Sequence, residues 1–348
     1  MIRAGSRSHQ PVESSLNGLE QRLEARHFAT VEAAVLKPQE GSLDRLGSKP
    51  VLPLHDDQGR RYVLKLADPE LRAAEVAAYE LRRLGRRPVV PAREVEVELP
   101  GVGTVTGLLK TYVDFDGELQ LASDTTTWTE LQRAILLQEH AWEWFLDNLD
   151  TNTSQYALLG EEAVPLNLDW DRAFSTEARS ELSRFAKYRA TLPNARTFLY
   201  SDYVQSRVEL PFSLLVQEAR RIRRLPTAEV RRVLEQYAAV RFPDLQAREE
   251  FVLRVLARKH RIEREAQRFV RALVQERRQL AGPTPTLRAS AHNAAVVLWG
   301  RWQVVLNCVL RGPVGDACRG VLTAVRGRRQ LPARTKTDIP RAEASAGH

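Results

Sequence analysis

Apolar and polar residues alternate over short stretches in the first third of the chain, a pattern that predicts β-strands. Turn residues, such as those at 56–59 and 100–103, separate these stretches and favour hairpins. The alternating stretches are 30–36, 51–54, 61–66, 93–99 and 104–113. We therefore expect a sheet of about five strands within residues 29–113.

Apolar residues at helical spacing predict the other elements. Residues 70–84 form a helix after the third strand, with Pro69 at its start and Gly85 after its end. A polar stretch at 114–118 is typical of a hinge. The further predicted helices are 129–146, whose aromatic side chains we assign to the core, then 175–190, 211–224, 227–240 and 248–280.

These elements predict an α+β fold: a small antiparallel β part with one helix, and a larger, mainly α-helical part. The predicted divisions are a flexible N-terminal segment 1–28, a β-rich part 29–113, a helical part 114–281 and a basic, partly disordered extension 282–348. Within the first segment we expect only a short helix, over 19–23.

The chain has 348 residues and a net charge of +8, so its surface is basic. An anionic partner such as a nucleotide, a nucleic acid or an acidic lipid is permitted, although arginines on solvated helix faces account for the charge equally well. The two cysteines form no disulfide framework or zinc pattern, and no secretory signal is recognisable. Both observations predict a cytoplasmic protein. The apolar run 294–310 contains Arg301 and is short for a membrane span, so we expect no transmembrane segment.

Candidate chemistry begins with two acids, Asp150 and Asp169. The apolar runs 156–159 and 164–166 between them predict a hairpin, with one acid just before its first strand and the other at the end of its second. Both carboxylates can then face one cleft. Phosphoryl transfer uses one acid to orient the attacking group and another to hold a metal ion. The ordinary alternative is a capped loop with solvated acids.

Lys65 lies among apolar residues of the third strand. Its side chain either faces solvent or, if it points inward, needs a partner. Glu75 abuts the apolar stripe of the next helix and is a suitable ion-pair partner, with Glu80 as the alternative if the helix is rotated.

The loop 41–50 contains small residues, among them Ser42, Gly47 and Ser48. A loop of this composition either lays backbone N–H groups over phosphates or is an ordinary surface loop.

Three segments in this order resemble the protein-kinase-like superfamily, and within it the HipA-like and phosphatidylinositol 3-/4-kinase-like branches. Residues 75–85 with Val90-Pro91 are similar to the helix of those branches and the Val-Pro that follows it. Residues 146–159 are similar to their catalytic loop and next strand, and 168–174 to their metal-binding segment. The resemblance covers roughly residues 30–175. It implies a two-lobed fold with Mg-ATP between the lobes and transfer to a hydroxyl acceptor.

The resemblance also implies roles for single residues. Lys65 would contact the nucleotide phosphates and Glu75 would hold it, while Asp150 would orient the acceptor hydroxyl. Asp169 would bind the magnesium ion, and Gln155 stands where the family usually has a metal-binding Asn. The remaining expected contacts are Asp171, as a second carboxylate for the metal, and Tyr112 and Val113, at the hinge beside the adenine.

The segment 151–155 departs from the family pattern. Thr151-Asn152 replaces the usual Arg-His or Asp-His pair, and Gln155 is one methylene longer than Asn, which moves its oxygen by roughly an ångström. A second register, with Asp147 as base and Asn152 as metal ligand, ranks lower because Gln155 directly abuts the apolar strand.

These departures keep a pseudokinase, a nucleotide-binding regulatory or scaffold module, as the alternative to an active kinase. A basic nucleic-acid-binding protein that uses the helical half is the second alternative, and a nucleic acid is a permitted but not a favoured partner. The sequence leaves open the acceptor, the oligomeric state and the choice between phosphoryl and nucleotidyl transfer.

Overall fold

A computed structural model describes the chain over residues 10–24, 36–38, 51–99, 101–113, 121–122, 124–148, 155–174 and 195–281. All of these residues belong to one compact unit, Met1–Val297. A second unit, Leu298–His348, lies outside the described residues. The same holds for the predicted strand 30–36 apart from Leu36, for the predicted helix 175–190 and for the predicted extension 282–348.

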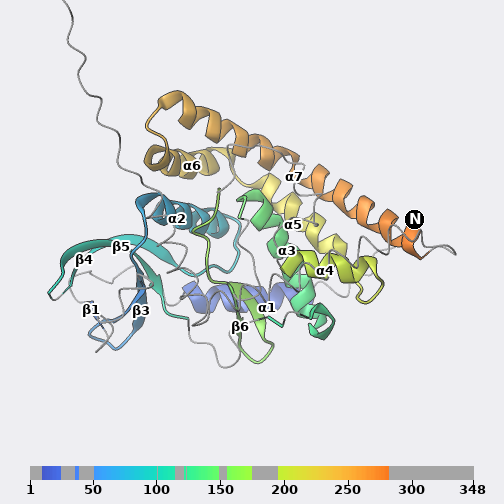
Figure 1. Cartoon of the computed structure of the whole chain (residues 1–348), viewed down its shortest axis with the longest axis horizontal. Helices are drawn as coiled ribbons and strands as arrows, with labels where there is room; N and C mark the ends of the chain where they lie inside the picture. The colour runs from blue at the N-terminus through green and yellow to red at the C-terminus, as the bar shows by residue number, and fades with distance from the viewer. Residues whose placement is uncertain are drawn as a thin grey trace, which may run out of the picture. The chain divides into compact units, whose positions relative to one another are not determined.

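The β part is one five-stranded antiparallel sheet (Figure 1). Its strands lie in the order β1-β2-β3-β5-β4. Their bounds are β1 Lys37–Pro38, β2 Val51–His55, β3 Arg61–Lys65, β4 Ala92–Leu99 and β5 Gly103–Thr111. The central strand β3 ends at Lys65, which pairs with Val51 on one side and with Leu108 on the other. The four longer strands confirm the predicted ones.

The alternation along β3 separates two faces of the sheet. Tyr62 and Leu64 are buried in an apolar cluster with residues of β2, β4 and β5. Val63 and Lys65 therefore lie on the opposite face. Lys110 of β5 is the direct cross-strand neighbour of Val63, so it shares this second face.

Helix α2, Pro69–Leu84, follows β3 as predicted and contacts β4 and α6. The helix-favouring sequence has Pro at its first turn, where the missing N–H costs no hydrogen bond. Its buried stripe contains Ala74, Ala78 and Leu81 together with one acid, Glu75. The predicted position of Glu75 beside the stripe is confirmed.

Helix α3, Glu130–Phe145, begins at a capping box formed by Thr129 and Gln132. Its Trp142 and Phe145 are fully buried, which confirms that the aromatic residues of this helix belong to the core. The predicted hairpin follows as β6, Tyr156–Leu159, and β7, Val164–Asn167, and it packs against α3.

The rest of the described helical part consists of α4 Ala195–Val204, α5 Phe212–Arg224, α6 Thr227–Arg241 and α7 Leu245–Leu280. Helices α6 and α7 lie side by side (Figure 1). The last three were predicted; α4 was not. Together with the sheet they confirm the α+β fold class. Within the described ranges, no helix has an apolar stretch long enough to cross a lipid bilayer.

Helix α1, Gln10–Glu24, is longer than the short helix predicted over 19–23. Its Val12, Leu16 and Leu19 follow helical spacing and are buried, in one cluster with Val90, Val113 and residues of α3 and the hairpin. The signal was present as three apolar residues in a polar segment. These three residues alone did not predict the full helix, because the apolar surface on which they pack supplies most of its stability.

Two buried arginines connect the β part to the helices. Arg87, between α2 and β4, donates through Nε to Glu218 of α5 at 2.7 Å, and Trp142 donates to the same carboxylate at 2.6 Å. Arg82 of α2 donates to Glu139 of α3 at 2.7 Å. Because a buried charge that loses its partner is strongly destabilising, these pairs fix α2 against the helical part.

We predict that Gly85→Ala destabilises the fold. A Cβ atom at position 85 would lie 2.3 Å from Cζ2 and 2.6 Å from Cη2 of Trp142, and both distances are far below van der Waals contact. The Trp142 ring is fully buried and its N–H is bound to Glu218, so the ring has no room to move. The expected loss is about 1–3 kcal/mol of unfolding free energy, measured by urea denaturation.

Gly18→Ala is the matched control. Gly18 lies within α1, and a Cβ atom there would meet nothing within 4 Å. Because alanine is the better helix former, its stability should be unchanged or higher by about 0.5–1 kcal/mol. Equal urea midpoints for the two variants would contradict the packing of Gly85 against Trp142.

Candidate functional site

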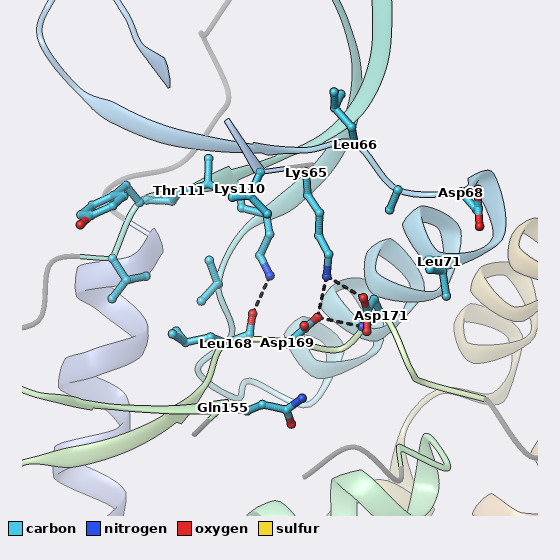
Figure 2. A pocket seen from close by; sticks show the side chains of 16 residues that line it. Lys65, Leu66, Asp68, Leu71, Lys110, Thr111, Gln155, Leu168, Asp169 and Asp171 are labelled. Atoms are coloured by element: carbon cyan, nitrogen blue, oxygen red, sulfur yellow. Dashed lines mark hydrogen bonds and ion pairs between the residues drawn. The ribbon is translucent and has the colours of Figure 1, made fainter. Parts of the chain in front are cut away.

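A cavity of about 740 Å³ lies beneath the second face of the sheet. Strands β2, β3 and β5, with the start of α2, line one side, and Gln155 with the segment 168–171 lines the other (Figure 2). The lining residues are Val51, Val63, Lys65, Leu66, Ala67, Asp68, Leu71, Val90, Lys110, Thr111, Tyr112, Val113, Gln155, Leu168, Asp169 and Asp171. The cavity thus collects residues that are distant along the chain.

Lys65 points from the sheet into this cavity, toward acids on its other side (Figure 2). Its Nζ lies 2.9 Å from Oδ1 of Asp169 and 2.7 Å from Oδ2 of Asp171. Lys65 and Asp169 are 104 positions apart in the sequence. The inward orientation of Lys65 is therefore found, and its nearest partners are the acids after the hairpin.

The predicted pair of Lys65 with Glu75 is also present, at a longer distance of 3.6 Å from Nζ to Oε2. The closer partner of Glu75 is Lys110 of β5, whose Nζ donates to Oε1. Lys110 also donates to the carbonyl oxygen of Leu168 at 2.5 Å. Glu75 therefore lies between two lysines, and one of them reaches the residue immediately before Asp169.

A tight polar turn holds the acidic segment in place. The backbone N–H of Asp169 donates to Oδ1 of Asn167 at 3.0 Å, and the N–H of Asp171 donates to Oδ1 of Asp169 at 3.3 Å. Asn148 donates through its side chain to the carbonyl oxygen of Asp169 at 3.4 Å. Asn167 ends β7, so the hairpin directs both carboxylates to one side of the cavity.

The charges of this cluster determine its pKa values. Burial by itself would lower the pKa of Lys65, but the carboxylates of Glu75, Asp169 and Asp171 outweigh it and raise the pKa above its ordinary value. Burial would raise the pKa of Asp169, yet the ammonium groups of Lys110 and Lys65 hold that pKa below its ordinary value. Asp169 is therefore ionised at neutral pH.

The cluster carries three carboxylates and two ammonium groups, which leaves a net charge of −1. Gln155 lies at the same end of the cavity, and its Oε1 is buried without a hydrogen-bond partner. Carboxylate and amide oxygens are the donors that magnesium prefers. Asp169, Asp171 and Gln155 all line the cavity, and their side-chain oxygens are of the chemical type that suits a hard divalent cation.

Apolar side chains form much of the remaining cavity wall, including Val51, Val63 and Val90. Tyr112 and Val113, the expected hinge residues, line the cavity where β5 ends. A cavity with apolar walls and charged groups suits a ligand that has both a flat apolar part and an anionic part.

Several predicted site residues lie outside the described residues. Asp150 and the loop residues Ser42, Gly47 and Ser48 belong to this group. Asn152, the metal ligand of the lower-ranked register, does too. Their roles stay predictions.

Lys110 is the site residue that the sequence reasoning missed. It occupies the same kind of position as Lys65, a lysine in an apolar strand, and this signal was present in Leu108-Leu109-Lys110. Asn167 was missed as well, because its role depends on the local turn after β7.

Comparison with known proteins gives a limited result. No protein-family model matches the chain, and no curated protein matches it. Among similar solved structures, the proinflammatory kinase CtkA of Helicobacter pylori has a TM-score of 0.41 and 12% identity, over 70% of this chain and 99% of that one. An aminoglycoside phosphotransferase of Alicyclobacillus acidocaldarius has a TM-score of 0.24 and 14% identity, over 79% and 99%. Likenesses at these values assign no activity to the chain.

Proposed function

We propose that the chain is a kinase-like phosphotransferase that binds Mg-ATP in the cavity beneath the sheet and transfers a phosphoryl group to a hydroxyl acceptor. One observation carries the proposal: Lys65 of β3 reaches across the cavity to Asp169 and Asp171, with Glu75 of α2 within 3.6 Å. A lysine and a carboxylate pair that converge on one cavity are what binding a metal–phosphate group requires.

In this proposal, each end of the cavity holds one part of the nucleotide. The Lys65 ammonium group binds phosphate oxygens, because it is the inward-facing cation nearest the acidic pair. The apolar walls around Val63 and Val90 hold the base, and the backbone at Tyr112 and Val113 lies along its edge.

Asp169, Asp171 and Gln155 are the residues that would hold magnesium. Such sites typically use one or two carboxylates, with phosphate oxygens and water completing the coordination. Within the described residues, no cluster of three or more His, Cys, Asp or Glu side chains forms a metal site on its own. A bound magnesium ion would neutralise charge on the phosphates during transfer.

The acceptor side of the reaction rests on the sequence. Asp150 is proposed to orient the acceptor hydroxyl, since it precedes β6 as the catalytic acid does in the resembled family. The HipA-like or phosphatidylinositol-kinase-like branch is likewise a proposal carried by the three segments alone. Because Thr151, Asn152 and Gln155 depart from the family pattern, a pseudokinase is the alternative function, and the experiment with labelled ATP below distinguishes the two.

We predict that the chain binds Mg-ATP in isothermal titration and that Asp169→Asn weakens this binding by at least on the order of tenfold, because the variant loses a metal-binding charge. Incubation with ATP labelled at the γ- or the α-phosphate then identifies the group that is transferred. Label from γ-phosphate alone, on the protein or in released phosphate, is expected.

Asp57→Asn is the control, because Asp57 is exposed in the β2–β3 turn and does not line the cavity. It should bind Mg-ATP like the wild type. Absence of binding at millimolar nucleotide would contradict the proposal. Binding without label transfer would support the pseudokinase alternative.

We also predict that Lys65→Met strengthens the binding of Mn²⁺ alone while it weakens that of Mg-ATP. In the structure the Lys65 ammonium group occupies both carboxylates, so it competes with a cation there but would favour the phosphates of a nucleotide. Each change should be on the order of tenfold, measured by Mn²⁺ electron paramagnetic resonance and by titration with Mg-ATP.

Lys37→Met serves as the matched control, because Lys37 is an exposed lysine on β1. It removes the same charge from the protein and should leave both affinities unchanged. If Lys65→Met bound Mn²⁺ no more tightly than Lys37→Met did, competition between Lys65 and the cation would be disproved.

A further inference from the structure

The Glu75 carboxylate has two lysine neighbours but uses only one of its oxygens in a hydrogen bond. Its side chain is 3% exposed. Oε1 accepts from Lys110, whereas Oε2 has no hydrogen-bond partner and lies 3.6 Å from the Nζ of Lys65. The carboxylate is thus held by Lys110 and has an unused acceptor facing Lys65.

Lys110 also connects Glu75 to the acidic segment. The same ammonium group donates to the carbonyl oxygen of Leu168, at 2.5 Å, and Leu168 immediately precedes Asp169 (Figure 2). The Lys110 side chain is only 11% exposed, so water offers little replacement for these two acceptors. One buried cation therefore joins β5, α2 and the segment that carries Asp169.

We propose that Lys110 is a positioning residue for the metal–phosphate site, and that Lys110 takes the place beside Glu75 so that Lys65 can change partners. The proposal rests on the proposed function. The two lysines then have different roles. Lys110 positions α2 and residue 168, while Lys65 binds the phosphate groups of the ligand.

The geometry gives Lys65 two sets of acceptors. Its present partners are Asp169 and Asp171, at 2.9 and 2.7 Å. If those carboxylates bound a cation, Lys65 would be free to turn toward the phosphates, and Oε2 of Glu75 could accept a hydrogen bond from its ammonium group. Without Lys110, Glu75 would attract Lys65 more strongly, and the carbonyl oxygen of Leu168 would lose its ammonium partner, although the N–H of Leu168 would still donate to Gln155.

The test is the effect of magnesium on ATP affinity. Isothermal titration with ATP is carried out in magnesium and again in EDTA, for the wild type and for Lys110→Met. In the wild type, magnesium should raise the affinity for ATP. In Lys110→Met we expect this increase to be smaller by on the order of tenfold. In EDTA the variant should lose less affinity for ATP than it loses in magnesium, because Lys110 hydrogen-bonds Glu75 and Leu168 and so acts mainly on the segment that carries Asp169.

Lys259→Met controls for the loss of any buried lysine. Lys259 of α7 is 1% exposed and donates to the carbonyl oxygen of Arg223 at 2.9 Å and to Thr227 at 3.3 Å, and it does not line the cavity. This variant should melt at a lower temperature and keep the full magnesium effect.

Glu75→Gln replaces Lys110→Met if the latter does not fold, since it breaks the same pair with little change in volume. It should lose part of the magnesium effect, because Lys110 then has no charged partner to hold it beside Leu168, and the double variant should lose no more than Lys110→Met alone. If the wild type bound no Mg-ATP, the proposed function would fail. If the wild type showed a magnesium effect that both Lys110→Met and Glu75→Gln retained in full, only the role of Lys110 would be disproved.

Discussion

A buried carboxylate between two ammonium groups is the interaction on which the arrangement of this site depends. Glu75 is on a helix, Lys65 and Lys110 are on different strands, and all three are largely withdrawn from water. A buried acid without such partners would cost several kcal/mol, so the two cations help to stabilise α2 against the sheet. The same two lysines reach residues 168 to 171, which ties the hairpin to the sheet.

Much of this site could be predicted from local pattern. A lysine in an apolar strand must find an anion if it points inward, and Glu75 beside an apolar stripe was a suitable one. The detailed pairing could not be predicted, because it follows from the sheet order. Strand β5 lies next to β3, which places Lys110 opposite Val63 and nearer to Glu75 than Lys65 is. The order of the strands along the chain does not reveal which strand lies next to β3 in the sheet.

The fold shows the same division between local and tertiary signals. Strong periodicity predicted α2, α3 and the β6–β7 hairpin close to their observed bounds. Helix α4 was missed because its sequence, ARTFLYSDYV, is rich in residues that are poor helix formers in isolation. Its Tyr200 is fully buried against Phe212 and Phe269, so tertiary packing stabilises the helix.

Helix α1 supports the cavity from behind. Val90 and Val113 line the cavity, and they also belong to the apolar cluster that Val12, Leu16 and Leu19 complete. Occupancy of the cavity and docking of α1 can therefore be linked equilibria, in which any effect of one on the other is returned with the same free energy. A ligand that tightens this wall would slow amide hydrogen exchange in residues 10–24, which line no part of the cavity themselves.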